Sequence, residues 1–172
     1  MARVEHDGEG LDFQKYNAVC LGGTFDHMHS GHNYLLTQAA LLTKKRMLIG
    51  VTSDILLKKK MHAHLVEPWE KRCDNVVRFL SRLCGPEIKI DLFELMDPAG
   101  KAATDNEIEA CILTKEVEKG GQIINSRRQE EGLCEIPLVF VDMILVSQGT
   151  EEEQAKFQNK MSSSLIRDFI HS

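Results

Sequence analysis

The chain has 172 residues, of which 42 % are hydrophobic and 27 % charged, and its formal net charge is −5. This length suits one domain around one core, and the composition is typical of a globular protein. The negative charge disfavours a nucleic-acid-binding module, because such modules carry a basic surface. No apolar run approaches the ~20 residues that span a bilayer, and the polar start of the chain does not resemble a signal peptide. We therefore expect a cytoplasmic protein with neither nucleic acid nor membrane as its partner.

The five cysteines are odd in number, and no two of them have a CxxC spacing. This pattern favours neither a disulfide framework nor a cysteine zinc site. Cys20 and Cys111 stand inside apolar runs. Because unpaired cysteine is usually buried, we expect both in the core.

Predicted strands and helices alternate along the chain. Residues 1–15, rich in charge and glycine, are expected to form a flexible N-terminal arm before a single domain over residues 16–172. Apolar runs predict buried strands at residues 18–22, 47–51, 88–95, 110–113 and 137–146. Helices are predicted over 31–43 with Ser30 as N-cap, from Pro68 until Gly85-Pro86, over 115–119 and about 123–131 with an interruption at Gly120-Gly121, and over 162–170.

This alternation predicts an α/β fold with a Rossmann-like, doubly wound sheet of five parallel strands in one domain. Ligands in such a fold bind beyond the carboxyl ends of the strands, where the strand order reverses. The loop at residues 23–30 follows the first predicted strand, and residues 114–116 follow the fourth. We expect a ligand near these loops.

The first loop contains the string GGTFDHMHSGH, which covers residues 22–32. Its paired glycines let the backbone come close to a ligand, and Thr24 offers a hydroxyl and an N–H to a phosphate. A loop-to-helix turn can bring His29 and His32 to one side. His32 then lies in the first helical turn, where N–H groups and the helix dipole favour anions. The alternatives are a plain turn, or a metal site at His27, His29 and His32 that lacks a fourth ligand at suitable spacing.

Three further groups of residues could hold phosphates. The serines at 162–164 stand at a predicted helix start, where they serve either a phosphate or only as a cap. The lysines in residues 54–60 could bind an acceptor phosphate or form a solvated basic surface. The guanidinium groups of Arg127 and Arg128 match polyphosphate oxygens, although paired helical arginines usually face solvent.

Together these motifs resemble the HxGH nucleotidyltransferase superfamily. With Asp97-Pro98-Ala99-Gly100 and Asp105, they resemble the pantetheine-phosphate adenylyltransferases of the eukaryotic and archaeal type, over about residues 18–167. The resemblance implies transfer of the adenylyl group of ATP to 4′-phosphopantetheine, which gives dephospho-coenzyme A and pyrophosphate in coenzyme A biosynthesis. It also implies Mg²⁺ as the accompanying ion.

The resemblance further implies roles for individual residues. His32 and Lys58 match catalytic residues, Lys58 through the acceptor phosphate, with Lys60 as the alternative lysine. Thr24 matches a residue that contacts both substrates. ATP contacts are implied for Gly22, Gly23, Thr24, Phe25, His29, Gly31, His32, Arg127, Arg128, Ser162, Ser163 and Ser164.

Two other functions remain open at this stage. One is another transferase of the superfamily, such as a cytidylyltransferase acting on a polyol phosphate, and the other is a non-catalytic nucleotide-binding protein of the same fold. The chain contains no GxxxxGK[ST] phosphate loop, so we expect no fused kinase activity. Small molecules are the expected partners, and a homo-oligomer is left open.

Overall fold

The computed structural model describes residues 15–58, 62–141 and 162–171. Five strands form one parallel sheet in the order β3-β2-β1-β4-β5. The strands are β1 (Tyr16–Gly23), β2 (Thr43–Thr52), β3 (Lys89–Leu95), β4 (Ala110–Leu113) and β5 (Leu138–Phe140). The predicted α/β fold with five parallel strands is confirmed.

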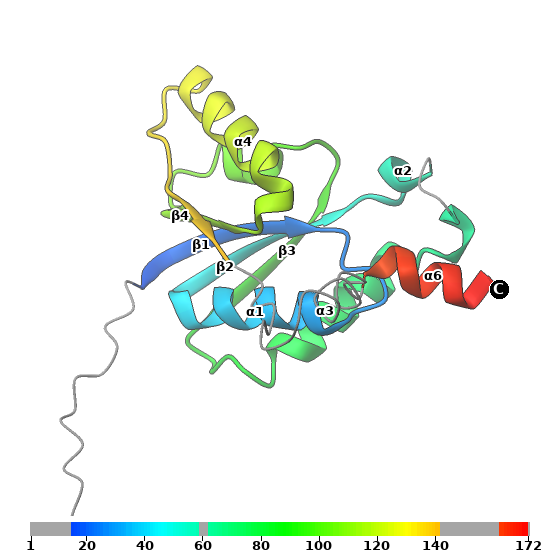
Figure 1. The fold of residues 1–172 in the computed structure, drawn as a ribbon. Coiled ribbons are helices and arrows are strands. Elements are labelled where there is room, and N and C mark those ends of the chain that lie inside the picture. The colour runs from blue at the N-terminus through cyan, green and yellow to red at the C-terminus, as the bar shows by residue number, and fades with distance from the viewer. Residues whose placement is uncertain (1–14, 59–61, 142–161, 172) are drawn as a thin grey trace, which may run out of the picture.

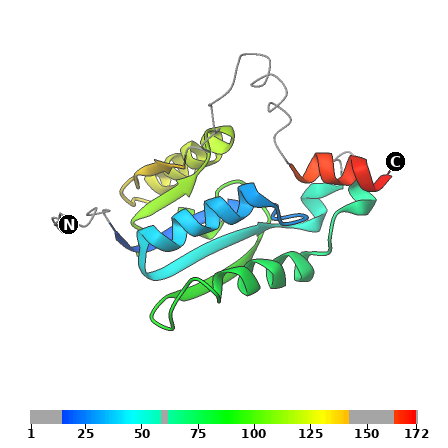
Figure 2. The same ribbon diagram turned by 60° about the horizontal axis from the view of Figure 1, so that its bottom comes forward.

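Helices cover both faces of this sheet (Figure 1). α1 (Ser30–Leu42) and α3 (Trp69–Leu80) lie on one face, and α4 (Glu118–Glu130) lies on the other. α6 (Ser163–His171) lies beyond the carboxyl ends of the strands, as Figure 2 also shows. The short elements are α2 (Asp54–Leu57), η1 (Ala63–Leu65), η2 (Gly100–Ala103) and η3 (Lys115–Val117). None of the helices in the described ranges is long and apolar enough to cross a membrane.

The sheet separates the core into two layers, and β1 contributes alternate side chains to each. Val19 and Leu21 pack in the layer with α1 and α3, whereas Ala18 and Cys20 pack in the layer with α4. Such alternation is what a strand buried on both faces requires. Cys20 and its neighbour across the β1–β4 ladder, Cys111, are 3 % and 4 % exposed, so their predicted place in the core is confirmed.

The strand order reverses next to β1, because β2 and β4 are its two neighbours. The loops after β1 and β4 therefore leave the sheet at its switch point, where open α/β sheets bind ligands. The sequence analysis expected a ligand near these two loops.

Several element boundaries differ from the sequence prediction, and one predicted strand is described only in part. α1 begins with His29 as N-cap rather than Ser30, because the His29 ring accepts the hydrogen bond from the Gly31 N–H. α3 ends at Leu80, before the predicted stop at Gly85-Pro86. β5 is described only to Phe140, and the predicted continuation to residue 146 lies outside the described residues.

The predicted interruption at Gly120-Gly121 is wrong, since α4 runs through both glycines. Packing explains the second glycine: a Cβ at Gly121 would stand 2.8 Å from a methyl group of Leu138 on β5. A Cβ at Gly120 would meet nothing within 4 Å. Gly121 thus lets α4 approach the sheet, a tertiary requirement that helix propensity does not reveal.

We predict opposite effects for alanine at these two neighbouring glycines. Gly120→Ala should raise the free energy of unfolding by about 0.5–1 kcal/mol, because alanine favours a helix. Gly121→Ala should not show this gain, because the added methyl group overpacks against Leu138. Its free energy of unfolding should be about 1–2 kcal/mol lower than that of Gly120→Ala. Urea unfolding of the two variants tests this. Equal stabilisation by both would contradict the close approach of α4.

Candidate active site

The loop after β1 lies between the ends of its two neighbouring strands. Gly23 is paired with Val51 of β2, and the Thr52 hydroxyl donates a hydrogen bond to the Gly23 carbonyl at 3.1 Å. On the other side, Cys20 is paired with Cys111, so the register brings Thr114 after β4 alongside the start of the loop. The site is therefore open between the segments that follow β1, β2 and β4.

His29 and His32 lie together where this loop enters α1. The His29 Nδ1 accepts the Gly31 N–H at 3.2 Å, and the centres of the two imidazole rings are 4.0 Å apart. His32 also contacts the Phe25 ring, with the ring centres 5.5 Å apart. These contacts hold both histidines at the N-terminus of α1, where a helix attracts anions.

Phe25 has a different place from the one the sequence predicted. Its side chain is fully buried in the core, and its backbone is in the left-handed region with φ 50°. A left-handed backbone in a bulky residue is strained and persists only where packing enforces it. Phe25 therefore anchors the loop, and its side chain is not available to ATP.

Asp26 joins the first motif to the C-terminal helix. The Asp26 carboxylate is fully buried and forms an ion pair with the buried guanidinium of Arg167 on α6. Its other oxygen accepts the Glu67 N–H at 2.9 Å, and its backbone carbonyl accepts the Ser163 hydroxyl at 2.6 Å. The partners of Asp26 on α6 are 137 and 141 residues away in sequence. The two predicted phosphate-binding motifs are thus brought together through Asp26.

The three serines make different contacts at the start of α6. The Ser162 hydroxyl accepts the Leu165 N–H at 3.2 Å and caps the helix, whereas Ser163 binds the Asp26 carbonyl. The Ser164 hydroxyl accepts a hydrogen bond from Arg167 at 3.1 Å. Figures 1 and 2 both show the N-terminal ends of α1 and α6 near each other. Two helix N-termini that face one region favour a bound polyanion.

Arg72 on α3 fixes the loops on the opposite side, and sequence reasoning missed it. Its fully buried guanidinium donates to the carbonyls of Thr24, Thr52 and Glu67 at 2.6, 2.7 and 2.9 Å. It also forms an ion pair with Asp54 at 2.6 Å. A signal existed in the sequence, because residues 72, 76 and 80 share one helix face with i, i+4 spacing and that face is otherwise apolar.

Glu67 also contacts the loop after β1. Its carboxylate accepts the His27 N–H at 2.9 Å and forms an ion pair with Lys71 at 2.9 Å. Burial by itself would raise the pKa of Glu67, but the Lys71 ammonium and the His27 N–H outweigh it and hold this pKa below its ordinary value. Glu67 is therefore a charged structural group at neutral pH.

Asp26, His27 and Glu67 have potential metal-ligand atoms within 4.8 Å of one another. Both carboxylates already accept backbone N–H groups and pair with Arg167 or Lys71. Mg²⁺ prefers oxygen ligands in octahedral geometry and usually retains several waters. This group therefore does not suit a resident magnesium ion.

Lys58 caps the end of α2 and lines a cavity of about 410 Å³. The cavity is also lined by Asp54, Leu57, Ala63, His64, Val66 and Pro68. Its position after β2 makes Lys58 available to an anion beyond the sheet edge. Lys60, the alternative lysine, lies outside the described residues.

The geometry does not support Arg127 and Arg128 as phosphate contacts. Both lie in the last turn of α4, at the end of the helix far from the β1 loop (Figure 1). Arg128 is buried, and its guanidinium donates to the carbonyls of Ala102, Asp105 and Cys134 at 2.7–2.8 Å. Arg127 is an exposed residue whose Nε lies 3.6 Å from the Glu130 carboxylate. A helix that follows a parallel strand runs back along it, so its C-terminus lies away from the ligand edge.

The segment that includes Asp97 and Asp105 also has structural roles. Asp97 accepts the N–H groups of Ala99 and Gly100, both at 2.9 Å, and so closes the turn after β3. Asp105 forms an ion pair with Arg46 at 2.9 Å. Pro98 and Ala99 line a small hollow at Gly22 and Gly50, between the sheet and α4. This turn therefore borders the carboxyl edge of β1.

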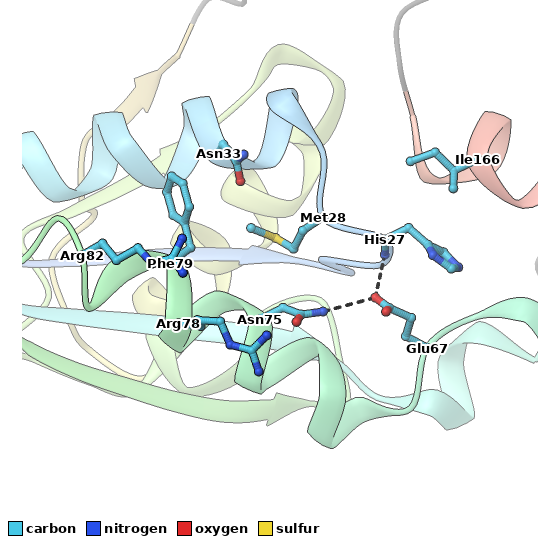
Figure 3. Close-up of a pocket in the computed structure, with 9 residues that line it drawn as sticks. All are labelled: His27, Met28, Asn33, Glu67, Asn75, Arg78, Phe79, Arg82 and Ile166. Atoms are coloured by element: carbon cyan, nitrogen blue, oxygen red, sulfur yellow. Dashed lines mark hydrogen bonds between the residues drawn. The ribbon is translucent and has the colours of Figure 1, made fainter.

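A separate pocket of about 480 Å³ lies between α1, α3 and α6 (Figure 3). Its lining residues are His27, Met28, Asn33, Glu67, Asn75, Arg78, Phe79, Arg82 and Ile166. The Glu67 carboxylate joins His27 and Asn75 across it, as the dashed lines in Figure 3 show. None of the residues with an implied role in catalysis or ATP binding lines this pocket. We do not assign it to the nucleotide.

Comparisons with known proteins show the family to which the chain belongs. A family model described as cytidylyltransferase-like matches residues 20–169. A curated phosphopantetheine adenylyltransferase from Pyrococcus abyssi is 31 % identical, and the match covers 89 % of this chain and 90 % of the relative. The chain belongs to the cytidylyltransferase-like family and, within it, to the group of the phosphopantetheine adenylyltransferases.

Two other matches define the extent of the similarity. A phosphopantetheine adenylyltransferase from Saccharomyces cerevisiae is 34 % identical over 94 % of this chain, but the chain spans only 51 % of that relative's length. A crystal structure of a protein of unknown function from Archaeoglobus fulgidus superposes with a TM-score of 0.64 and 32 % identity. That match covers 78 % of this chain and 96 % of the archaeal chain. The similarity therefore extends over most of this chain, which spans about half the length of the yeast relative.

We predict that Asp26→Asn lowers the free energy of unfolding by about 3 kcal/mol or more, because Arg167 remains buried without its counter-charge. Asp74→Asn, at an exposed carboxylate of α3, is the matched control and should stay within about 0.5 kcal/mol. Chemical denaturation measures both values.

The double variant Asp26→Asn with Arg167→Met should lose less stability than the sum of its single changes, because it leaves no unpaired charge. Strict additivity would show that the Asp26–Arg167 pair does not couple the loop to α6.

Proposed function

We propose that the chain transfers the adenylyl group of ATP to 4′-phosphopantetheine and releases dephospho-coenzyme A and pyrophosphate. The observation that carries this proposal is the connection at Asp26, which brings the histidine loop and the serine helix together. The names of the curated relatives support the choice of nucleotide and acceptor. We further propose that the protein acts on these small molecules in the cytoplasm.

The reaction is an in-line displacement at the α-phosphorus of ATP. An oxygen of the acceptor phosphate attacks, a new phosphoanhydride bond forms, and the bond to the leaving pyrophosphate breaks. A phosphate monoester is already largely ionised near neutral pH. The protein therefore has to position two anions and stabilise developing charge, and it supplies no nucleophile.

Each proposed contact has a position consistent with this mechanism. His32, at the N-terminus of α1, donates to the α-phosphoryl group, and His29 supports its ring by stacking. Thr24, between the ends of β1 and β2, faces both substrates. Lys58, in its cavity after β2, holds the acceptor phosphate.

The polyphosphate is assigned to the start of α6, with Ser162, Ser163 and Ser164, and to the backbone at Gly22, Gly23 and Gly31. We replace Arg127 and Arg128 with Lys115, because Lys115 directly follows Thr114 at the end of β4. The parallel β1–β4 pairing, in which Cys20 is opposite Cys111, supports this choice, because the segment after β4 then leaves the sheet at the same edge as the loop after β1. Magnesium enters as part of the MgATP substrate.

The decisive experiment measures pyrophosphate release from MgATP with and without 4′-phosphopantetheine. We expect release that requires the acceptor, together with an equal amount of dephospho-coenzyme A. CTP should replace ATP poorly. Efficient use of CTP with a polyol phosphate would instead favour a cytidylyltransferase, as the family description allows. Nucleotide binding without release for any acceptor would indicate a non-catalytic protein.

Variants at His32 and Arg127 test whether activity depends on the histidine loop or on the arginine contacts expected from sequence. His32→Ala should lower kcat about 10²–10³-fold, the typical cost of losing one group that stabilises transition-state charge. Arg127→Ala should leave kcat/KM near the unsubstituted value, because Arg127 lies at the far end of α4. Steady-state kinetics with folded variants measures both. A large loss in Arg127→Ala would contradict the location proposed for the polyphosphate.

A further inference from the structure

Three histidines and one aspartate gather where η1 meets α6, outside the residues proposed for catalysis. His62 and His64 flank the first residue of η1, and Asp168 and His171 share one face of α6. The ring centre of His171 lies 4.2 Å from that of His62 and 5.8 Å from that of His64. The ring centres of His62 and His64 are 6.3 Å apart. Segments more than 100 residues apart in sequence thus contribute to one imidazole cluster.

The spacing of these rings matches what a single metal ion requires. Zinc holds histidine nitrogens at about 2.0–2.1 Å in a tetrahedron, which places the centres of bound imidazole rings about 5 Å apart. The three measured separations, 4.2, 5.8 and 6.3 Å, bracket this value. Modest rotation of the side chains can therefore direct one nitrogen of each ring toward a common point.

Asp168 supplies an oxygen ligand at the same place. Its Oδ1 is buried and accepts no hydrogen bond from the residues that the structure describes, yet it lies 3.2 Å from the His62 Nε2. Two ligand atoms on one tetrahedral zinc ion lie about 3.3 Å apart. A carboxylate oxygen at this distance from a histidine nitrogen, and without a hydrogen-bond donor of its own, is suited to share an ion with that nitrogen.

We propose that His62, His64, Asp168 and His171 bind one divalent transition-metal ion of the zinc class. Imidazole nitrogen with one carboxylate favours such ions, whereas magnesium and calcium prefer oxygen ligands alone. The side chains of His62 and Asp168 are 22 % and 44 % exposed, so an ion can reach them from solvent. The ligand atoms do not converge within 4.8 Å in the present structure, so binding closes the site by turning the rings.

A bound ion would connect η1 to α6. α6 carries Ser163, Ser164 and Arg167, and η1 lines the cavity of Lys58 through Ala63 and His64. The ion would therefore restrain the two sides of the substrate region relative to each other. This makes the site a structural clamp that is separate from the magnesium of the nucleotide.

The test is a titration of the intact chain with Co²⁺, whose visible absorption reports tetrahedral coordination, followed by displacement with Zn²⁺. We expect one Co²⁺ per chain. His171→Ala and Asp168→Asn should each weaken binding at least about tenfold. Cys134→Ser is the matched control, since it alters an exposed thiol outside η1 and α6, and it should bind normally.

His171 is an exposed residue at the C-terminal end of α6, so its replacement tests metal binding without removing buried contacts. Circular dichroism should show an unchanged fold in His171→Ala, and Zn²⁺ should raise the Tm of the unsubstituted chain but not of this variant. The proposal is overturned if the unsubstituted chain binds no Co²⁺. It is equally overturned if binding survives both His171→Ala and Asp168→Asn, or if Cys134→Ser abolishes it.

Discussion

The burial of one carboxylate, that of Asp26, constrains the rest of the site. A buried charge is costly unless it is paired and hydrogen-bonded, and Arg167 together with the Glu67 N–H meets this requirement. Because Arg167 belongs to the last helix and Asp26 to the first loop, the pair fixes α6 against the end of β1. The N-termini of α1 and α6 consequently face the same region, which is where we propose that the polyphosphate binds.

A second buried cation, Arg72, organises the other side of the same loop. The carbonyl groups at the end of β2 and in the segments that follow β1 and β2 need hydrogen-bond donors, because an unsatisfied buried carbonyl costs about 1–3 kcal/mol. One guanidinium satisfies Thr24, Thr52 and Glu67 together. A transferase that supplies no nucleophile depends on rigid positioning of its substrates. The two buried arginines therefore provide rigidity, whereas the chemistry is proposed for the histidines, lysines and serines.

The sheet was predictable because its signals are local. Buried strands such as Ala110–Leu113 are short apolar runs, and the prediction for that strand matches its observed bounds. The histidine loop was predictable because its glycines, Thr24 and His32 are contiguous. The continuity of α4 was not predictable, because Gly121 allows the helix to pack against Leu138 and does not break it. The phosphate contact predicted for Arg128 is not supported for a related reason. Its three carbonyl partners belong to segments that only the fold brings next to α4.

The sequence by itself determined the alternation of strands and helices, the position of the histidine loop and the class of enzyme. These depend on residue types within a few positions of one another, and hydrophobic periodicity and motif spacing report them directly. Only the tertiary structure decided which polar residues have structural partners and therefore which remain for the proposed substrate contacts. Charge pairs such as Asp26 with Arg167, and the imidazole cluster of η1 and α6, join residues more than 100 positions apart. Their energies depend on burial and on distance in space, which neither composition nor local spacing contains.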